Sequence, residues 1–212
     1  MVIKAVLFDF DGTIADTHDA FLEIVNNLAD EFGYPQVDQV QLERLKNLSS
    51  MDIIRYSGIP SLKIPFIIKR VKKELSKKIA TLKPYYAIDK ALLALHENGY
   101  LIGIVTSNLK ENVNTFLKNN DLDTLFSFIH SGTTLFGKNK MINAVLKEHK
   151  LSCDEVIYVG DETRDIHAAQ KSNILMISVG WGFNSPTILA KHKPDFLVYH
   201  PIELVKIIEQ LS

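Results

Sequence analysis

Short hydrophobic runs rich in β-branched residues recur along the chain, and segments with helical periodicity separate most of them. Near-continuous apolar runs of this length are typical of strands that are buried on both faces of a parallel sheet. The pattern predicts six strands, at residues 3–8, 101–105, 128–130, 156–159, 175–179 and 196–198. Because strands alternate with helical segments, we expect an α/β fold with a doubly wound parallel sheet.

The long stretch between the first two strands has a helical pattern throughout. Amphipathic periodicity predicts helices at residues 20–32, 37–47, 51–57 and 64–81, and glycines and prolines such as Gly33, Pro35 and Gly58 separate them. Pro84 follows, just before a helix expected at 88–97. We therefore expect a small all-helical cap domain at residues 17–82, inserted into a core formed by residues 1–16 and 83–212.

Composition narrows the class of protein. Hydrophobic residues make up 46% of the 212 positions and the formal net charge is −1, so nothing favours nucleic acid as a partner. The single cysteine, Cys153, excludes an intrachain disulfide and a CxxC zinc site. The N-terminal residues read as a strand rather than a signal peptide, and no apolar run has the length of a membrane span. We expect a soluble, cytoplasmic monomer or dimer without a membrane partner.

Polar residues follow four of the predicted strands. They are Asp9, Asp11 and Gly12 after the first strand, Thr106, Ser107 and Asn108 after the second, Lys138 after the third, and Asp161 and Asp165 after the fourth. In a doubly wound sheet, ligands bind beyond the carboxyl ends of the strands, so these side chains are expected at one edge of the sheet. Taken alone, the residues after the second strand also fit the N-terminal cap of a helix.

The order of these motifs resembles that of a known family. DFDGT at residues 9–13, a strand-terminal threonine, a lysine and GDETRD at residues 160–165 are similar to the motifs of the haloacid dehalogenase superfamily. With a helical insertion after the first motif, the chain resembles the phosphoglycolate phosphatase-like hydrolases of that superfamily. The resemblance covers essentially the whole chain. It implies a phosphatase that acts on a small phosphorylated metabolite.

Phosphate-ester chemistry suggests a role for each residue of the first motif. A carboxylate can attack phosphorus and form an aspartyl phosphate, and Asp9 is the candidate nucleophile. Asp11 is the candidate acid that protonates the leaving alcohol and then activates water. Gly12 supports this arrangement, because glycine permits backbone conformations that let both carboxyl groups face one phosphorus atom.

The remaining site residues are assigned to the metal and the phosphate. The charges of two carboxylates and a phosphate require a cation, for which Mg²⁺ is the default. The resemblance implies that Asp9, Asp161 and the backbone carbonyl of Asp11 bind it. Asp165 supports the ligands, and Glu162 is its rival for this role. The phosphoryl oxygens are assigned to Thr106, Ser107 and Lys138, with Asn108 in support and Lys140 as the alternative lysine.

Two other functions stay open at this point. A β-phosphoglucomutase-like phosphotransferase would carry a histidine about twelve residues after the nucleophile, as the resemblance implies, but Phe21 stands there. A phospho-accepting regulatory module also combines acids, a threonine and a lysine on a doubly wound sheet, although it does not need the helical insertion. Asp11 argues against a dehalogenase of the superfamily, because that reaction has no leaving alcohol to protonate.

Three segments outside these motifs are candidates for substrate contacts. The polar break NLSSMD at residues 47–52 is the expected substrate-facing loop of the cap, with Asn47, Ser49 and Ser50 as its candidate residues. The basic segment KRVKKELSKK at residues 69–78 is either the solvated face of a helix or a positive rim that attracts an anionic substrate. Residues 181–183, after the fifth strand, either line the mouth of the site or pack in the core.

Overall fold

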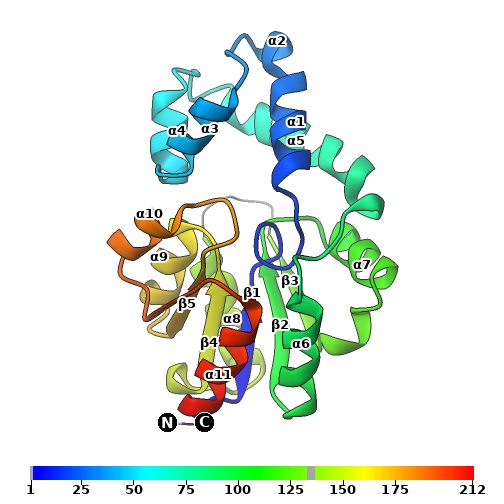
Figure 1. Ribbon diagram of the computed structural model, residues 1–212, viewed down its shortest axis with the longest axis vertical. Helices are drawn as coiled ribbons and strands as arrows, with labels where there is room; N and C mark the ends of the chain where they lie inside the picture. The colour runs from blue at the N-terminus through cyan, green and yellow to red at the C-terminus, as the bar shows by residue number, and fades with distance from the viewer. Residues whose placement is uncertain (1, 133–136) are drawn as a thin grey trace.

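The computed structural model describes residues 2–132 and 137–212, and within them six strands form one parallel sheet. The strands are β1 (Ala5–Phe8), β2 (Leu101–Thr106), β3 (Phe128–Ser131), β4 (Val156–Gly160), β5 (Leu175–Val179) and β6 (Phe196–Val198). Their order across the sheet is β3-β2-β1-β4-β5-β6, so β1 is paired on both sides. Figure 1 shows this sheet in the lower part of the molecule.

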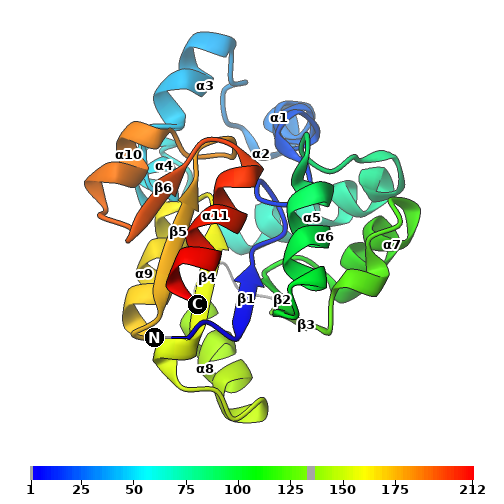
Figure 2. The same ribbon diagram turned by 60° about the horizontal axis from the view of Figure 1, so that its bottom comes forward.

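Helices cover both faces of the sheet (Figures 1 and 2). Val6 and Phe8 pack against one layer, and Ala5 and Leu7 pack against the other, because alternate side chains of a strand point to opposite faces. The first layer contains α6 (Ile88–Glu97), α7 (Lys110–Asn119) and α11 (Pro201–Leu211). The second contains α8 (Lys138–Glu148), α9 (Thr163–Lys171) and α10 (Pro186–Lys191). The expected doubly wound α/β fold is confirmed.

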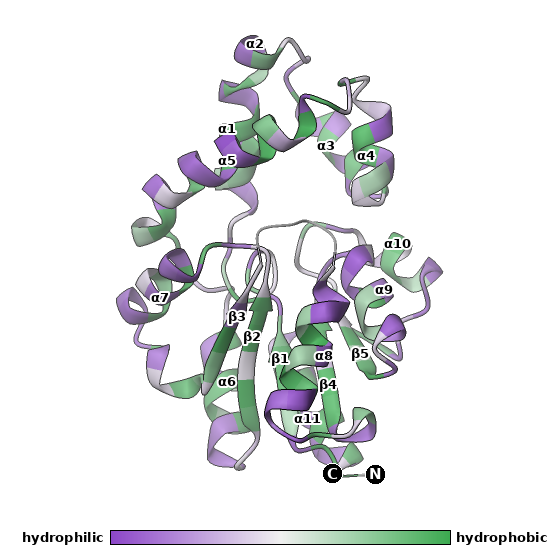
Figure 3. Cartoon of the chain, turned by 180° about the vertical axis from the view of Figure 1, so that it is seen from behind, coloured by the Kyte–Doolittle hydropathy of each residue, from purple (hydrophilic) through white to green (hydrophobic). Residues whose placement is uncertain are grey.

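The insertion between β1 and β2 is helical. It contains α1 (His18–Asn27), α2 (Ala29–Phe32), α3 (Gln39–Leu45), α4 (Ser50–Tyr56) and α5 (Ile64–Lys78), and a 3₁₀ turn at Ile79–Thr81 follows. α1 and α5 pack through Ile24, Leu28, Val71 and Leu75, which form a small hydrophobic core of their own. Figure 3 shows green hydrophobic positions concentrated on the strands and purple hydrophilic positions on the outer helices.

The segments that enter and leave the insertion lie side by side. The backbone N–H of Asp16 donates to the carbonyl of Lys83 at 2.9 Å, and that of Tyr85 donates to the carbonyl of Ile14 at 3.0 Å. Two connecting segments, hydrogen-bonded to each other, therefore join the inserted helices to the sheet. The exact ranges expected for the cap and the core remain a prediction.

Most differences from the predicted elements occur in the insertion. The helix expected at 20–32 is divided at Leu28, where the backbone tightens to φ −91° and ψ −4°. Gly33 then ends the second piece in the left-handed conformation, with φ 73°, which glycine adopts without strain. The helix expected at 37–47 is shorter, because Asp38 and Gln41 form a capping box that starts it at Gln39.

Candidate active site

The end of β1 places Asp9 in the interior of the protein. Its carboxylate accepts a hydrogen bond from the backbone N–H of Phe10 at 2.7 Å, and its side chain is almost entirely inaccessible to solvent. The chain then leaves extended geometry, and Gly12 adopts φ 78°. A Cβ atom at Gly12 would overlap the carboxylate of Asp161, so this turn requires glycine for its conformation and for its close approach.

Lys138 supplies positive charge to this carboxylate. It is the first residue of α8, and its Nζ lies 2.5 Å from Asp9 Oδ2 and 2.5 Å from Asp165 Oδ1. Gly137 precedes it as the N-cap of α8 and adopts φ 111°, a backbone conformation that favours glycine. The helix therefore begins directly at the lysine that contacts the aspartates. Lys140 is exposed. The geometry therefore brings Lys138, and not its rival, to the aspartates.

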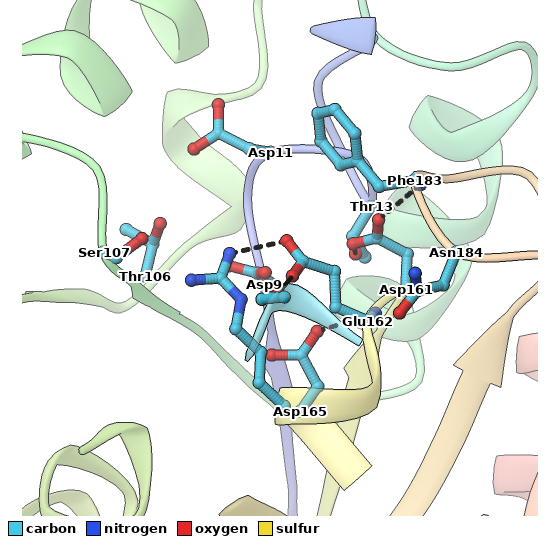
Figure 4. Close-up of polar contacts among 12 residues, drawn as sticks. Asp9, Asp11, Thr13, Thr106, Ser107, Asp161, Glu162, Asp165, Phe183 and Asn184 are labelled. Atoms are coloured by element: carbon cyan, nitrogen blue, oxygen red, sulfur yellow. Dashed lines mark hydrogen bonds and ion pairs between the residues drawn. The ribbon is translucent and has the colours of Figure 1, made fainter. Parts of the chain in front are cut away.

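The end of β4 contributes Asp161 and Asp165. Asp161 is buried and accepts hydrogen bonds from Thr13 Oγ1 at 2.8 Å and from the backbone N–H of Phe183 at 2.7 Å. Asp165 Oδ2 accepts from the backbone N–H of Glu162 at 3.0 Å, within the capping box that starts α9. Figure 4 shows these side chains converging with Asp9. Glu162 itself does not belong to this group of carboxylates.

The end of β2 contributes Thr106, Ser107 and Asn108. The buried Thr106 Oγ1 accepts a hydrogen bond from the backbone N–H of Asn108 at 3.0 Å, so its own proton remains available to a ligand. Asn108 Nδ2 donates to both carboxylate oxygens of Asp11, at 3.0 and 2.9 Å. The interpretation of these residues as the cap of the next helix is wrong, because α7 has Leu109 as its N-cap and no side-chain cap bond.

Burial away from solvent has the largest influence on the pKa values of the aspartates. It raises the pKa of Asp9 to about 7, although the charge of Lys138 opposes the shift. It also raises the pKa of Asp161 well above its usual value, and Glu162 and Asp165 add to the effect. Burial alone would lower the pKa of Lys138, but the neighbouring carboxylates outweigh it and the net direction is upward. The site therefore favours additional positive charge.

Oxygen atoms suited to a metal ion are grouped in the same place. One carboxylate oxygen from each of Asp9, Asp161 and Asp165 lies within 4.8 Å of the others, and all three residues are buried. Hard divalent cations such as Mg²⁺ prefer this kind of ligand. Three carboxylate oxygens grouped away from solvent form a donor set that fits such a cation, and burial raises the pKa of Asp9 and Asp161 in its absence.

Comparison with known proteins agrees with this geometry. The family profile described as "Haloacid dehalogenase-like hydrolase" matches residues 6–179. The chain belongs to this family of hydrolases. It is 31% identical to a phosphoglycolate phosphatase of Synechococcus elongatus over 209 residues, which cover 99% of each protein. It is 25% identical over 224 residues to the pyrophosphatase PpaX of Anoxybacillus flavithermus, which cover 98% of each.

A solved structure shares the fold of this haloacid dehalogenase-like hydrolase. The crystal structure of a predicted phosphatase from Clostridium acetobutylicum superimposes with a TM-score of 0.85, at 23% identity, over 99% of this chain and 100% of that one. The expected enzyme class, a haloacid dehalogenase-like phosphatase similar to phosphoglycolate phosphatases, is therefore confirmed. Among the described residues, no helix is long and apolar enough to cross a membrane.

The polar loop of the hydrolase's inserted helices lies against the core. Asn47 Oδ1 accepts from Ser185 Oγ at 2.6 Å, and Ser50 Oγ donates to Glu162 Oε2 at 2.8 Å. Ser49 caps α4, since its hydroxyl accepts from the backbone N–H of Asp52 at 3.2 Å. Two of the three residues expected to face substrate therefore contact the core, and a substrate role for all three remains a prediction.

Asn184 makes the central hydrogen bonds between the inserted loop and the core, and the sequence pattern does not identify it as a site residue. Its side-chain amide donates to the carbonyls of Leu48 at 3.0 Å and Lys46 at 3.3 Å, and its oxygen accepts from the N–H of Thr163 at 2.9 Å. It thus joins the loop of residues 46–50 to the first turn of α9. We call this set of bonds, together with those of Asn47 and Ser50, the latch. No local pattern around Asn184 indicates contacts with residues so distant in sequence.

Two other contributors to the site lie within segments that the sequence did single out. Arg164, inside GDETRD, donates from Nη2 to Glu162 Oε1 at 2.6 Å. Phe183 packs edge-on against Phe21, with ring centroids 5.5 Å apart, whereas Trp181 Nε1 donates to the carbonyl of Thr13 at 3.1 Å. Of the two interpretations of residues 181–183, packing describes Trp181, and Phe183 lies between the inserted helices and Asp161.

Proposed function

We propose that this protein is a Mg²⁺-dependent phosphatase that hydrolyses a small phosphorylated metabolite through an aspartyl phosphate on Asp9. The observation that carries the proposal is the buried cluster in which Lys138 contacts both Asp9 and Asp165, with Asp161 alongside. Phosphatases among its relatives support the same chemistry.

In the first step, a carboxylate oxygen of Asp9 attacks phosphorus and the bond between phosphorus and the ester oxygen breaks. Asp11 gives a proton to the departing oxygen, so the leaving group departs as an alcohol. Asn108 holds both oxygens of Asp11 in position for this transfer. Burial raises the pKa of Asp11, which favours the protonated form that an acid needs.

In the second step, Asp11 takes a proton from water, and the water attacks the phosphorus of the aspartyl phosphate. The bond between phosphorus and Asp9 breaks, and inorganic phosphate is released with the Asp9 carboxylate restored. During both steps, Thr106, Ser107 and Lys138 bind the phosphoryl oxygens and stabilise the charge on them. Gly12 allows the chain to bring both aspartates to one phosphate.

The metal site rests on the same cluster. Asp9, Asp161 and the backbone carbonyl of Asp11 would hold Mg²⁺. Asp165 would orient these ligands and also hold Lys138 in place. When bound, the ion supplies charge neutralisation between the carboxylates and the substrate phosphate. The fit follows from the buried oxygens and the raised pKa of Asp161.

We propose that residues 17–82 form a mobile cap that closes over the site and selects the substrate. The two paired connecting segments give it a hinge, and closure would exclude water from the aspartyl phosphate. Phosphoglycolate is the first candidate substrate, because a relative of full length bears that activity in its name. Residues Asn47 and Ser50 are candidates for coupling closure to substrate choice.

The decisive experiment measures phosphate release from p-nitrophenyl phosphate with Mg²⁺ and with EDTA. We expect EDTA to abolish turnover and added Mg²⁺ to restore it. Asp9→Asn should be inactive while remaining folded, because the amide is nearly isosteric but a poor nucleophile. Asp154→Asn, an exposed acid before β4, is the matched control and should keep full activity. Normal turnover by Asp9→Asn would refute the nucleophile assignment.

A further inference from the structure

A buried asparagine on α7 joins the inserted helices to the residue that holds Asp11. Asn112 is almost inaccessible to solvent, and its side-chain nitrogen donates to Asn108 Oδ1 at 2.8 Å and to Ser76 Oγ at 2.9 Å. Ser76 belongs to α5 in the insertion, whereas Asn108 follows β2 in the core. Because a buried amide needs hydrogen-bond partners, these bonds constrain Asn108 as well as Asn112.

The direction of each hydrogen bond in this chain of contacts is fixed. The backbone N–H of Leu109 donates to the Asn108 side chain at 2.7 Å, and because a backbone N–H can only donate, the atom that it meets is the oxygen. The Ser76 hydroxyl donates to the backbone carbonyl of Lys72 at 2.9 Å, so its oxygen accepts from Asn112. A flipped amide at Asn112 would place its oxygen against two acceptors. The observed orientation satisfies both partners.

These bonds turn the Asn108 amide toward the proposed acid. The oxygen of the amide is held by two N–H donors, so its nitrogen faces the two carboxylate oxygens of Asp11, at 3.0 and 2.9 Å. Ser131 Oγ donates to the backbone carbonyl of Asn108 at 2.6 Å, which fixes the backbone but not the rotation of the amide. Asn112 therefore links that rotation to α5 of the insertion.

We propose that Asn112 is a positioning residue for the acid–base steps, which keeps the Asn108 amide turned toward Asp11 and connects this orientation to Ser76 on α5. The inference rests on the proposed function, because it takes Asp11 as the proton donor to the leaving oxygen. Asn112 acts through Asn108 rather than on the reacting atoms. A misplaced acid transfers its proton poorly, so the loss of Asn112 matters most where the leaving oxygen needs a proton.

The simplest competing role for Asn112 is to hold α5 against α7. Asn119 on α7 makes a contact of that kind, since its Nδ2 donates to the carbonyl of Ala80 at 3.2 Å, in the 3₁₀ turn that follows α5. The loss of a packing contact lowers turnover of every ester by the same factor. The loss of a positioning residue lowers turnover chiefly for esters with a strongly basic leaving oxygen.

The test compares benzyl phosphate with p-nitrophenyl phosphate. The two esters are similar in shape, but the benzyl alkoxide is a poor leaving group that needs a proton, whereas p-nitrophenolate departs with little protonation. The value of kcat/KM covers the steps up to the departure of the leaving group, so the ratio between the two esters reports on proton transfer in the first step.

This benzyl-to-nitrophenyl ratio is measured in the wild type, Asn112→Leu, Asn112→Ala, Asn108→Ala, the double variant Asn108→Ala/Asn112→Leu, and Ser76→Ala. Asn114→Leu, at an exposed asparagine of the same helix, is the matched control. Melting temperatures show which variants are folded. Asn112→Ala serves where the larger side chain of Asn112→Leu prevents folding.

We expect both single variants of Asn112 to lower the ratio about fivefold, the factor that corresponds to the loss of one hydrogen bond. The double variant should have the same ratio as Asn108→Ala alone, because Asn112 acts through Asn108. Ser76→Ala should give a smaller decrease, and Asn114→Leu should keep the wild-type ratio.

An unchanged ratio in the folded variants of Asn112 would overturn the inference and leave the phosphatase function intact. So would a double variant whose loss equals the product of the two single losses. Asp11→Asn is the reference for the proposed function, and it should lower the ratio more than any of these variants. If Asp11→Asn keeps the wild-type ratio, or the wild type hydrolyses p-nitrophenyl phosphate alone, Asp11 is not a working acid and the inference fails with that assignment. A wild type that releases phosphate from neither ester with Mg²⁺ would refute the proposed function itself.

Discussion

Replacing Asn184 by aspartate should release the inserted helices from the core without disturbing α9. The aspartate retains an oxygen that accepts from the N–H of Thr163, a bond of 2.9 Å within the core. It lacks the two N–H donors that reach the carbonyls of Leu48 and Lys46 at 3.0 and 3.3 Å. The substitution therefore removes only those bonds of the latch that Asn184 makes to the inserted helices.

The magnitude follows from these two hydrogen bonds. At a net contribution of about 1 kcal/mol each, their loss disfavours closure by about 2 kcal/mol. This corresponds to a shift of about 30-fold in the equilibrium between closed and open forms. The longer bond, to Lys46, contributes less than the shorter one, and Ser185 still donates to the same carbonyl at 2.8 Å. The estimate covers the lost hydrogen bonds alone, and repulsion between the new carboxylate and these two carbonyl oxygens adds to it.

Two measurements check the prediction. Fluorescence energy transfer between a dye on α3 and one on α10 should show a larger separation in Asn184→Asp, and kcat/KM for a metabolite substrate should fall by about the same factor or more. Asn27→Asp, the same substitution at an exposed position of α1, controls for the added charge. If Asn184→Asp keeps wild-type transfer efficiency and kcat/KM, the latch does not govern closure and the reasoning fails.

Two further predictions concern the core. Gly182→Ala would place a Cβ atom in overlap with Asp161, so the carboxylate must move by roughly 1 Å and kcat should fall about a hundredfold. Circular dichroism checks that the fold is unchanged. A wild-type kcat would show that the placement of Asp161 is not critical. Burial, His192 and Lys171 lower the pKa of His167, so neutral His167 contributes stability that is lost as the pH falls below about 6.5. His167→Gln should therefore lose less stability than the wild type in urea unfolding at acidic pH, and identical pH slopes would contradict this.

The fold follows from sequence because its signals are local. Strands such as β1 and β4 are apolar runs that must be buried on both faces, and their periodicity differs from that of the helices between them. The break at Leu28 was not predictable, because the apolar pattern continues through it and packing against α5 decides where the chain turns. The order of the strands is likewise set by packing between elements rather than within them.

The residues of the site likewise include some that local sequence identifies and others that only the packing of distant segments reveals. Asp9, Asp11 and Asp161 are recognisable because acids directly after buried strands require a partner or a function. Asn184 carries no such signal, since it lies in a loop. Its importance arises from contacts between the inserted helices and the core, which depend on how the two parts pack and are not encoded in either segment alone.

The central position of β1 has a consequence for how the protein is made. β1 precedes every other strand in the sequence, yet it pairs with β2 on one side and with β4, about 150 residues later, on the other. Contacts between such distant segments slow folding, because a long loop must close before they form. A nascent chain that has not yet reached β4 exposes one edge of β1 to other strands, which favours aggregation. The strand that directly precedes Asp9 is therefore synthesised early but enclosed late, and a nascent chain acquires the aspartate cluster only after most of its length has been translated.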